Sequence, residues 1–369
     1  MSLKVNADSI MDWYGHARTL MPFIIRRHMG YFFYITGRCN LNCDYCWQRE
    51  TPESISENTK TGRNELSGDE WIKIIKSVPK LSFVGLTGGE PLIHPEFKKI
   101  IEYMGGRLPY TVNTNGVLLN EDILTKLIKY KATNLSISLD GFSDVHDLSR
   151  KRPGLFDHIV EAIGRLNTLK KKMHSAKPSL TIKTVLLDSL LERLDEFYGF
   201  CDKVLKADCL NISVMKTTAH AQYDFRTYEG LKEIRNIGTP ECYKYSYSDK
   251  IPEALNNLLE ISKRKKCKVL IYPRMHDKHS LELLFKADGK GIFDSCYIPM
   301  SLMVILADGS IIPCLSVKIA NIRELDFDVR RINTLGKYND FLRWRNAMNR
   351  TEQSPPECNM CCFSKVKKQ

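Results

Sequence analysis

The feature of this chain that most constrains its fold is a regular alternation of short β-rich runs with amphipathic helical patterns. The β-rich runs are 31–37, 81–89, 110–116, 134–141, 180–187 and 209–215. The helical patterns are 68–78, 94–104, 120–130, 154–172 and 189–205, with Ser67, Asn120 and Ser189 as predicted N-caps. Strands that alternate with helices connect by right-handed crossovers into a parallel sheet covered on both faces. The sequence therefore predicts an α/β fold whose sheet closes into a barrel, forms a partial barrel or stays open.

Residues that could take part in catalysis or ligand binding follow the ends of these predicted strands. Cys39 follows the first strand, the run Gly88–Pro91 follows the second, and Asn115 follows the third. Ser138 and Asp140 end the fourth strand. Because ligands of parallel barrels bind at the carboxyl ends of the strands, we expect these four loops to meet at one mouth.

Three cysteines, Cys39, Cys43 and Cys46, stand in the loop after the first strand at the spacing Cys-x3-Cys-x2-Cys. A closed structural zinc site takes four ligands, whereas three thiolates on one loop suit three corners of a [4Fe–4S] cluster and leave one iron open. The chain has 12 cysteines, and its first residues lack the apolar region of a signal peptide. We therefore expect a cytoplasmic protein with reduced thiols that serve metal or redox chemistry.

The runs CNLNCDYC, TGGEP, TNG and SLDG with HDLSR occur in this order over residues 31–215. Together they resemble the motifs of the radical S-adenosylmethionine (radical SAM) superfamily. The resemblance implies a partial (β/α)6 TIM-like barrel in which Cys39, Cys43 and Cys46 hold a [4Fe–4S] cluster, with SAM chelating the open iron. It also implies reductive cleavage of SAM to methionine and a 5′-deoxyadenosyl radical, which abstracts a hydrogen atom from the substrate.

By the same resemblance, other motif residues are predicted to bind SAM. Tyr45 offers a π face to adenine, with packing beneath the loop as the alternative. Gly88 and Gly89 let the backbone approach the methionyl group, because a glycine has no side chain to collide with it. Glu90 accepts a charge-assisted hydrogen bond from the SAM amino group.

Further predictions concern the third and fourth strands. Asn115 and Ser138 are placed to reach the ribose hydroxyls or the SAM carboxylate, and Arg150 presents a forked guanidinium to that carboxylate. Asp140 has two open interpretations, a role at the site or a brace for its own turn. His146 is predicted to lie in a loop, in a surface or packing role.

A second group of cysteines lies near the C-terminus, where Cys296 and Cys314 flank a predicted hairpin with an Asp-Gly turn, and Cys358, Cys361 and Cys362 follow in PPECNMCCF. This order resembles the twitch domain, a shortened relative of the SPASM domain, and implies one auxiliary [4Fe–4S] cluster on Cys296, Cys314, Cys358 and Cys361. Cys362 is an alternative to Cys361. Zinc is the competing metal for four cysteines at such spacing.

The predicted organisation is an N-terminal extension at 1–29, a radical SAM barrel at 30–285 and a twitch-like domain at 286–369. We expect the last to cover the mouth of the barrel and to exclude water. The expected enzyme is of oxidoreductase type, carrying out a two-electron oxidation or a cross-link with the auxiliary cluster as electron acceptor. Its expected partner is an electron donor such as flavodoxin or ferredoxin.

The substrate class stays open at this stage between a small molecule or cofactor precursor, a lipid and a peptide. Because 38 residues precede Cys39, we expect no separate leader-peptide domain there, which argues against a ribosomal peptide. The segment 11–30 either packs on the barrel or lies on a membrane surface. The net charge of +12 permits an anionic substrate, nucleic acid, a membrane surface or an acidic electron donor, and it does not choose among them. A nucleic-acid-binding zinc protein and a non-catalytic iron–sulfur carrier are the alternatives from other classes. The first leaves the GGEP loop without a role, and the second would not cleave SAM.

Overall fold

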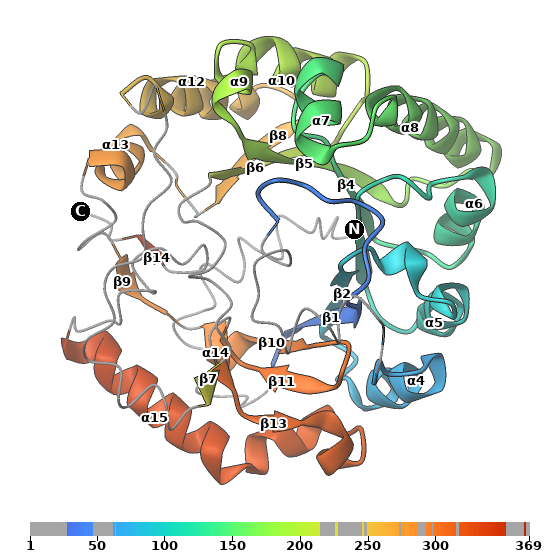
Figure 1. Cartoon of the computed structure of the whole chain (residues 1–369), viewed down its shortest axis with the longest axis vertical. Helices are drawn as coiled ribbons and strands as arrows, with labels where there is room; N and C mark the ends of the chain where they lie inside the picture. The colour runs from blue at the N-terminus through green and yellow to red at the C-terminus, as the bar shows by residue number, and fades with distance from the viewer. Residues whose placement is uncertain are drawn as a thin grey trace, which may run out of the picture.

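A computed structural model of the chain describes a partial barrel with helices on its outer side (Figure 1). The described residues are 28–46, 62, 64–214, 226–227, 246, 249–272, 275, 277–286, 293–296, 298–314, 317–351 and 365–366. Residues 1–27 and the cysteines Cys358, Cys361 and Cys362 lie outside them, together with the expectations attached to them. Within the described part, none of the helices combines the length and the apolar character needed to cross a membrane.

Seven parallel strands form the barrel wall, each hydrogen-bonded to the next in the order β1-β2-β3-β4-β5-β6-β8. Their bounds are β1 Gly30–Thr36, β2 Phe83–Gly88, β3 Tyr110–Thr114, β4 Asn134–Ser138, β5 Ser179–Leu186, β6 Cys209–Val214 and β8 Lys268–Tyr272. Among the described strands, the sheet does not close on itself. The predicted partial barrel and its six first strands are confirmed, and β8 adds one more.

Helices cover the outer face of this curved sheet (Figure 1). Their bounds are α4 Gly68–Ser77, α5 Phe97–Met104, α6 Glu121–Lys129, α7 Ser143–Arg150, α8 Leu155–Lys172, α9 Asp188–Leu191, α10 Leu194–Lys203, α12 Ile251–Lys263 and α13 Lys278–Lys286. The predicted cap at Ser67 is confirmed as a capping box with Glu70, and Asn120 accepts from the backbone N–H of Ile123. Side-chain caps of this kind satisfy N–H groups that the first helical turn leaves unpaired.

Two helix predictions are wrong. The N-cap predicted at Ser189 is replaced by Leu187, because α9 already begins at Asp188, whose carboxylate suits the positive helix start. The single helix predicted over 189–205 is split into α9 and α10, which begins at Leu194. The loop predicted around His146 is the helix α7, where Val145, His146 and Arg150 form the buried face.

The two faces of the barrel sheet differ in chemistry. Side chains on the outer face are apolar and buried, as shown by Phe33 and Leu86, and the Phe33 ring lies 5.2 Å from that of Trp71 on α4. The alternate positions face the barrel interior and include Asn113, Lys183 and other polar residues. The outer face therefore forms the main core with the helices, and the inner face is available for ligands.

The C-terminal segment extends the same sheet. Strand β10 (Leu302–Ile305) pairs in parallel with β1, and β11 (Ser310–Ile312) and β13 (Ala320–Asn321) follow in antiparallel pairing. The predicted Asp-Gly hairpin is confirmed between β10 and β11, where Gly309 has a φ of +86°. The other elements are β7 Arg226–Thr227, β9 Phe293–Ser295, β12 Val317–Lys318, β14 Lys365–Val366, α14 Ile298–Ser301, α15 Gly336–Thr351 and the 3-10 helices η2 Pro91–Ile93, η4 Ile322–Leu325 and η5 Val329–Thr334.

Candidate active site at the carboxyl ends of the strands

The loop after β1 carries three thiols that affect one another electrostatically. Cys43 is buried, Cys46 is partly buried, and the Cys46 N–H donates to the Cys43 carbonyl at 3.2 Å. Cys39 is an exposed residue whose thiol is partly desolvated, and this desolvation is the main cause that raises its pKa to about 11. The charges of Glu90, Cys46 and Cys43 raise this pKa to a smaller extent, against a backbone hydrogen bond that lowers it. Bound metal offsets such a penalty, because it stabilises thiolates.

The donor set of this loop fits an iron–sulfur cluster. Within the described residues, no three His, Cys, Asp or Glu side chains converge as a preassembled metal site. The fit therefore rests on three thiols of the right type in one loop, on their mutual electrostatics and on their position at the barrel mouth.

Glu65 fixes the start of this loop, and the sequence analysis did not identify it. Its carboxylate accepts from the Thr36 hydroxyl at 2.7 Å, from the Gly37 N–H at 2.8 Å and from the Arg38 guanidinium at 3.1 Å. The partners lie 27–29 residues away in sequence, so no local pattern could have predicted the contact.

The GGEP loop after β2 lies directly against the cysteine loop. The Gly89 N–H donates to the Thr36 carbonyl at 2.9 Å, and the Glu90 N–H donates to the Arg38 carbonyl at 2.8 Å. A Cβ on Gly88, which has a φ of +146°, would lie 2.2 Å from the Thr36 oxygen, and one on Gly89 would lie 2.3 Å from the Arg38 oxygen. Both glycines are thus required for contact with the cysteine loop, and their approach to the SAM methionyl group stays a prediction.

Glu90 is a fully buried carboxylate held only by neutral donors among the described residues. It accepts from the Asn115 N–H at 2.6 Å, from the Thr114 hydroxyl at 2.8 Å and from the Leu92 N–H at 3.1 Å. Burial raises its pKa to about 7, and these hydrogen bonds oppose the shift. Three acceptor positions are used, so the carboxylate can accept one more donor.

Asn115 joins the third strand to the cysteine loop. Its side-chain amide donates to Asn40 Oδ1 at 2.8 Å and lies 3.7 Å from Cys39 Sγ, and its Oδ1 accepts from the Val117 N–H at 3.0 Å. Ser138 ends β4 in register with Lys183 and makes no side-chain hydrogen bond within the described residues. The predicted contacts of both residues with SAM stay predictions.

Asp140 is the centre of a second buried network. Arg150 donates to its two oxygens at 2.7 and 3.1 Å, the Val185 N–H donates at 3.0 Å, and the Tyr45 hydroxyl also donates to it. Burial raises the pKa of Asp140, but the Arg150 guanidinium and these hydrogen bonds lower it below its usual value. Of the two interpretations left open for Asp140, the structure therefore favours the brace, which joins β4, β5, α7 and the cysteine loop.

The same network changes the interpretation of Arg150 and Tyr45. The guanidinium fork predicted to face the SAM carboxylate faces Asp140, because that carboxylate is close and equally buried. The guanidinium also lies 5.4 Å from the centre of the Tyr45 ring. The role of Tyr45 toward adenine stays a prediction. His146 has the predicted packing role, since its Nδ1 accepts from the Asp140 N–H at 3.1 Å and burial lowers its pKa to about 4.

The C-terminal cysteines are only partly described. Cys296 and Cys314 are both partly buried. Strand β9, which ends just before Cys296, pairs with β14, in which Lys365 lies opposite Ser295. The pairing brings the chain that follows Cys362 beside Cys296, while Cys358, Cys361 and Cys362 themselves lie outside the described residues.

Comparisons with known proteins agree with this fold and site. The model of the radical SAM superfamily matches residues 33–187. A probable GTP 3′,8-cyclase of Methanopyrus kandleri is 30% identical over 57% of this chain and 67% of its own length. The mycofactocin maturase MftC of Mycobacterium tuberculosis is 28% identical over 44% of this chain and 39% of its own length. The chain belongs to the radical SAM superfamily, whose cofactors are a [4Fe–4S] cluster and SAM.

Solved structures extend the fold comparison to the C-terminal segment. The crystal structure of Streptococcus suis SuiB covers 98% of this chain and 78% of that protein with a TM-score of 0.63 and 14% identity. The likeness includes the part of the chain beyond the barrel and concerns the fold alone. Since the matched segments span 67% of the cyclase and 39% of the maturase, the activities of those whole proteins do not transfer directly.

Proposed function

We propose that Cys39, Cys43 and Cys46 hold the [4Fe–4S] cluster of this chain and that the enzyme cleaves SAM reductively beside them. The observation that carries the proposal is the direct hydrogen bonding of the three-thiol loop to the loop of Glu90, a buried carboxylate with one acceptor position left. When bound, the cluster supplies the electron that converts SAM to methionine and a 5′-deoxyadenosyl radical.

The surrounding residues then have separate roles. Glu90 accepts a charge-assisted hydrogen bond from the SAM amino group, and its buried position strengthens that bond. Asn115 and Ser138 bind polar atoms of SAM from the ends of β3 and β4. Tyr45 contributes a ring that the Asp140 network holds in place.

The test is SAM cleavage by anaerobically purified enzyme with dithionite as reductant. The wild type is expected to form 5′-deoxyadenosine, and the triple variant Cys39→Ala/Cys43→Ala/Cys46→Ala is expected to form none. Cys201→Ala is the matched control, because that buried thiol lies on α10 in the outer layer. Cleavage that persists in a clean triple variant would refute the assignment.

We propose further that Cys296, Cys314, Cys358 and Cys361 hold one auxiliary [4Fe–4S] cluster. The pairing of β9 with β14 supports the proposal, because it returns the C-terminal chain to Cys296. Reconstituted wild type should then contain about eight irons, and the triple variant of the first loop about four. Cys314→Ala should lower the iron content while retaining part of the SAM cleavage. A colourless triple variant with stoichiometric zinc would replace this cluster by a zinc site.

For the net reaction we propose a two-electron oxidation or cross-link of a peptide, with the auxiliary cluster as electron acceptor and a flavodoxin or ferredoxin as donor. Support comes from the names of similar proteins, which include the mycofactocin maturase and SuiB bound to its precursor peptide SuiA. The test is mass spectrometry of a peptide encoded beside the gene after incubation with enzyme, SAM and reductant. Loss of two hydrogens is expected, and an unmodified peptide beside an active SAM cleavage would favour a small-molecule substrate.

A further inference from the structure

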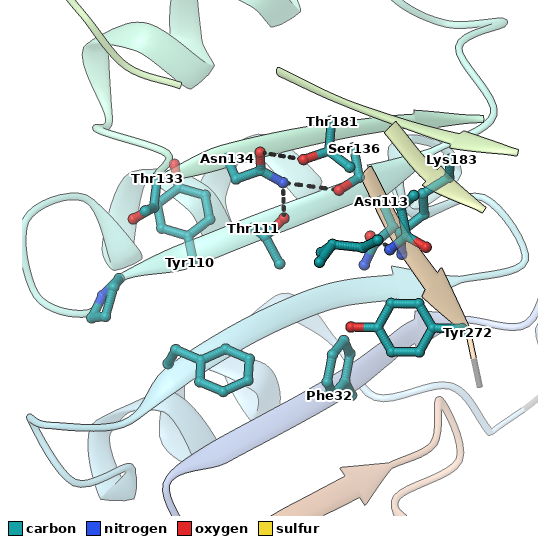
Figure 2. A pocket seen from close by; sticks show the side chains of 14 residues that line it. Phe32, Tyr110, Thr111, Asn113, Thr133, Asn134, Ser136, Thr181, Lys183 and Tyr272 are labelled. Carbon is teal, nitrogen blue, oxygen red and sulfur yellow. Dashed lines mark hydrogen bonds between the residues drawn. The ribbon is translucent and has the colours of Figure 1, made fainter. Parts of the chain in front are cut away.

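The interior of the barrel contains a cavity of about 110 Å³ whose lining combines aromatic and apolar side chains with polar ones. Side chains from all seven barrel strands, β1 to β6 and β8, line it. Figure 2 shows Asn113 and Lys183 beside each other, with the rings of Phe32 and Tyr272 lining the same space. Barrels of this kind are ordinarily filled by bulky branched residues. Because one water needs about 10–15 Å³ by this measure, the cavity can hold several waters or a small polar group.

The part of the cavity near the amino ends of the strands is satisfied internally. Asn134 donates to the Thr111 hydroxyl at 3.1 Å and to the Ser136 hydroxyl at 2.9 Å, and it accepts from Thr181 at 3.0 Å (Figure 2). Every polar atom of the Asn134 side chain therefore has a partner. This layer needs no ligand and forms the floor of the cavity.

In the layer nearer the mouth, some polar side-chain atoms have no hydrogen-bond partner among the described residues. Lys183 Nζ donates to Asn113 Oδ1 at 2.7 Å, its one hydrogen bond within the described residues, although an ammonium group has three donors. The described cavity lining contains no aspartate or glutamate. Asn211 Oδ1, on the neighbouring strand in register with Lys183, is buried without a hydrogen-bond partner. A partly buried cation with unused donors and no counter-ion among the described lining residues is costly unless something else pairs with it.

We propose that Lys183, oriented by Asn113, binds a carboxylate or phosphate group of the substrate inside the barrel. The inference names the substrate class of the proposed enzyme as anionic, and it rests on that proposed function. Burial lowers the pKa of Lys183 to about 8, so the ammonium form still dominates near neutral pH. Lys183 lies in register with Ser138 at the end of β4, which sets the anionic group just below the predicted SAM site and leaves the rest of the substrate facing the mouth.

The test is isothermal titration of the reconstituted enzyme, saturated with SAM, with acetate and with methyl phosphate. Acetamide, which has the shape of acetate without its charge, is the control ligand. The wild type is expected to bind one of the anions at least tenfold more tightly than acetamide, a difference of about 1.4 kcal/mol. The anion that binds more tightly distinguishes a carboxylate from a phosphate.

Two variants locate the binding. Lys183→Met removes the charge, and Asn113→Asp places a fixed carboxylate beside Nζ, so each should reduce anion affinity at least tenfold. Lys203→Met is the matched control, because it removes the same charge from the exposed face of α10 and should bind as the wild type does. Circular dichroism confirms that each variant is folded.

Several outcomes would overturn the proposal. They are equal binding of acetate and acetamide, no anion binding by the wild type, and unchanged affinity in Asn113→Asp. A parallel loss of SAM affinity in Lys183→Met would assign the lysine to the SAM carboxylate and would also overturn it. Since the assay does not use SAM cleavage, a wild type that binds acetate at Lys183 but leaves SAM intact would refute the proposed function alone.

Discussion

Two fully buried carboxylates at the mouth of the barrel, Asp140 after β4 and Glu90 after β2, have opposite electrostatics. Asp140 has a guanidinium on both of its oxygens, and its pKa is lowered despite its burial. Glu90 accepts only from two backbone N–H groups and one hydroxyl, and burial raises its pKa to about 7. Both lie in loops that contact the cysteine loop.

The difference separates a brace from a binding group. A buried charge whose counter-ion is supplied by the fold is already neutralised, so its removal should mainly affect stability. A buried charge that has no counter-ion from the fold is still able to attract a ligand of opposite charge. By this criterion we assign Asp140 to the scaffold and propose Glu90 for the SAM site, with Lys183 as its proposed cationic counterpart inside the barrel.

The largest effect is expected at Asp140. Asp140→Asn leaves Arg150 buried without its charge partner, and we expect the free energy of unfolding in urea to fall by about 3–5 kcal/mol. Asp144→Asn is the matched control, because that exposed aspartate on α7 pairs with Arg193 at the surface, where a change under about 1 kcal/mol is expected. The double variant Asp140→Leu/Arg150→Met should recover most of the loss. Equal stability of the two single variants would contradict the brace.

The next largest effect is expected at Glu90, where the substitution should weaken SAM binding more than it lowers stability. Glu90→Gln keeps the size of the side chain and removes its charge, so the dissociation constant of SAM should rise at least tenfold, within the roughly 1.5–3 kcal/mol of a charged hydrogen bond. Calorimetry with SAM measures it. The iron–sulfur absorption should persist, and the loss of stability should be smaller than in Asp140→Asn. An unchanged SAM affinity would reduce this loop to a structural turn.

The pH dependence of anion binding tests whether the Lys183 ammonium group is the group that binds the anion. Its pKa is lowered to about 8 by burial, so the ammonium form is lost as the pH rises through that value, and acetate affinity should fall about tenfold between pH 7 and pH 9. The other titratable groups there are Tyr110 and Tyr272, which line the cavity, and the Cys209 thiol, which raises the lysine pKa slightly. A flat profile in the wild type would argue against an ammonium ligand.

The smallest effect is expected at Tyr45. Tyr45→Phe removes one hydroxyl donor from Asp140, which keeps its hydrogen bonds from Arg150 and Val185. The free energy of unfolding should fall by about 1 kcal/mol. SAM affinity should stay within twofold if the ring alone contacts adenine. A loss as large as that of Asp140→Asn would mean that Tyr45, and not Arg150, is the main partner of the carboxylate.

The sequence predicted the strands, most helices and the loops at the mouth, because each depends on a local pattern of apolar periodicity or a short motif. It could not predict the partners of Glu65 or Asp140, which join residues up to 95 positions apart. The sequence contained a pattern that points to Lys183, although the sequence analysis did not use it. Strands of a parallel sheet covered on both faces are near-continuously apolar, whereas residues 179–183 of β5 alternate polar and apolar side chains. That alternation indicates an inner face that is not part of the core.

The pairing of β10 with β1 has a consequence for synthesis of the chain. One edge of β1 stays unpaired until residue 302 has emerged from the ribosome, although its other edge can pair with β2 soon after residue 88. At about 5–20 residues per second, this delay lasts on the order of ten to forty seconds. During it, an aromatic strand that leads directly to the cysteine loop presents an open edge to other nascent chains. We therefore expect the open edge of β1 to need protection from such pairing until β10 has been made.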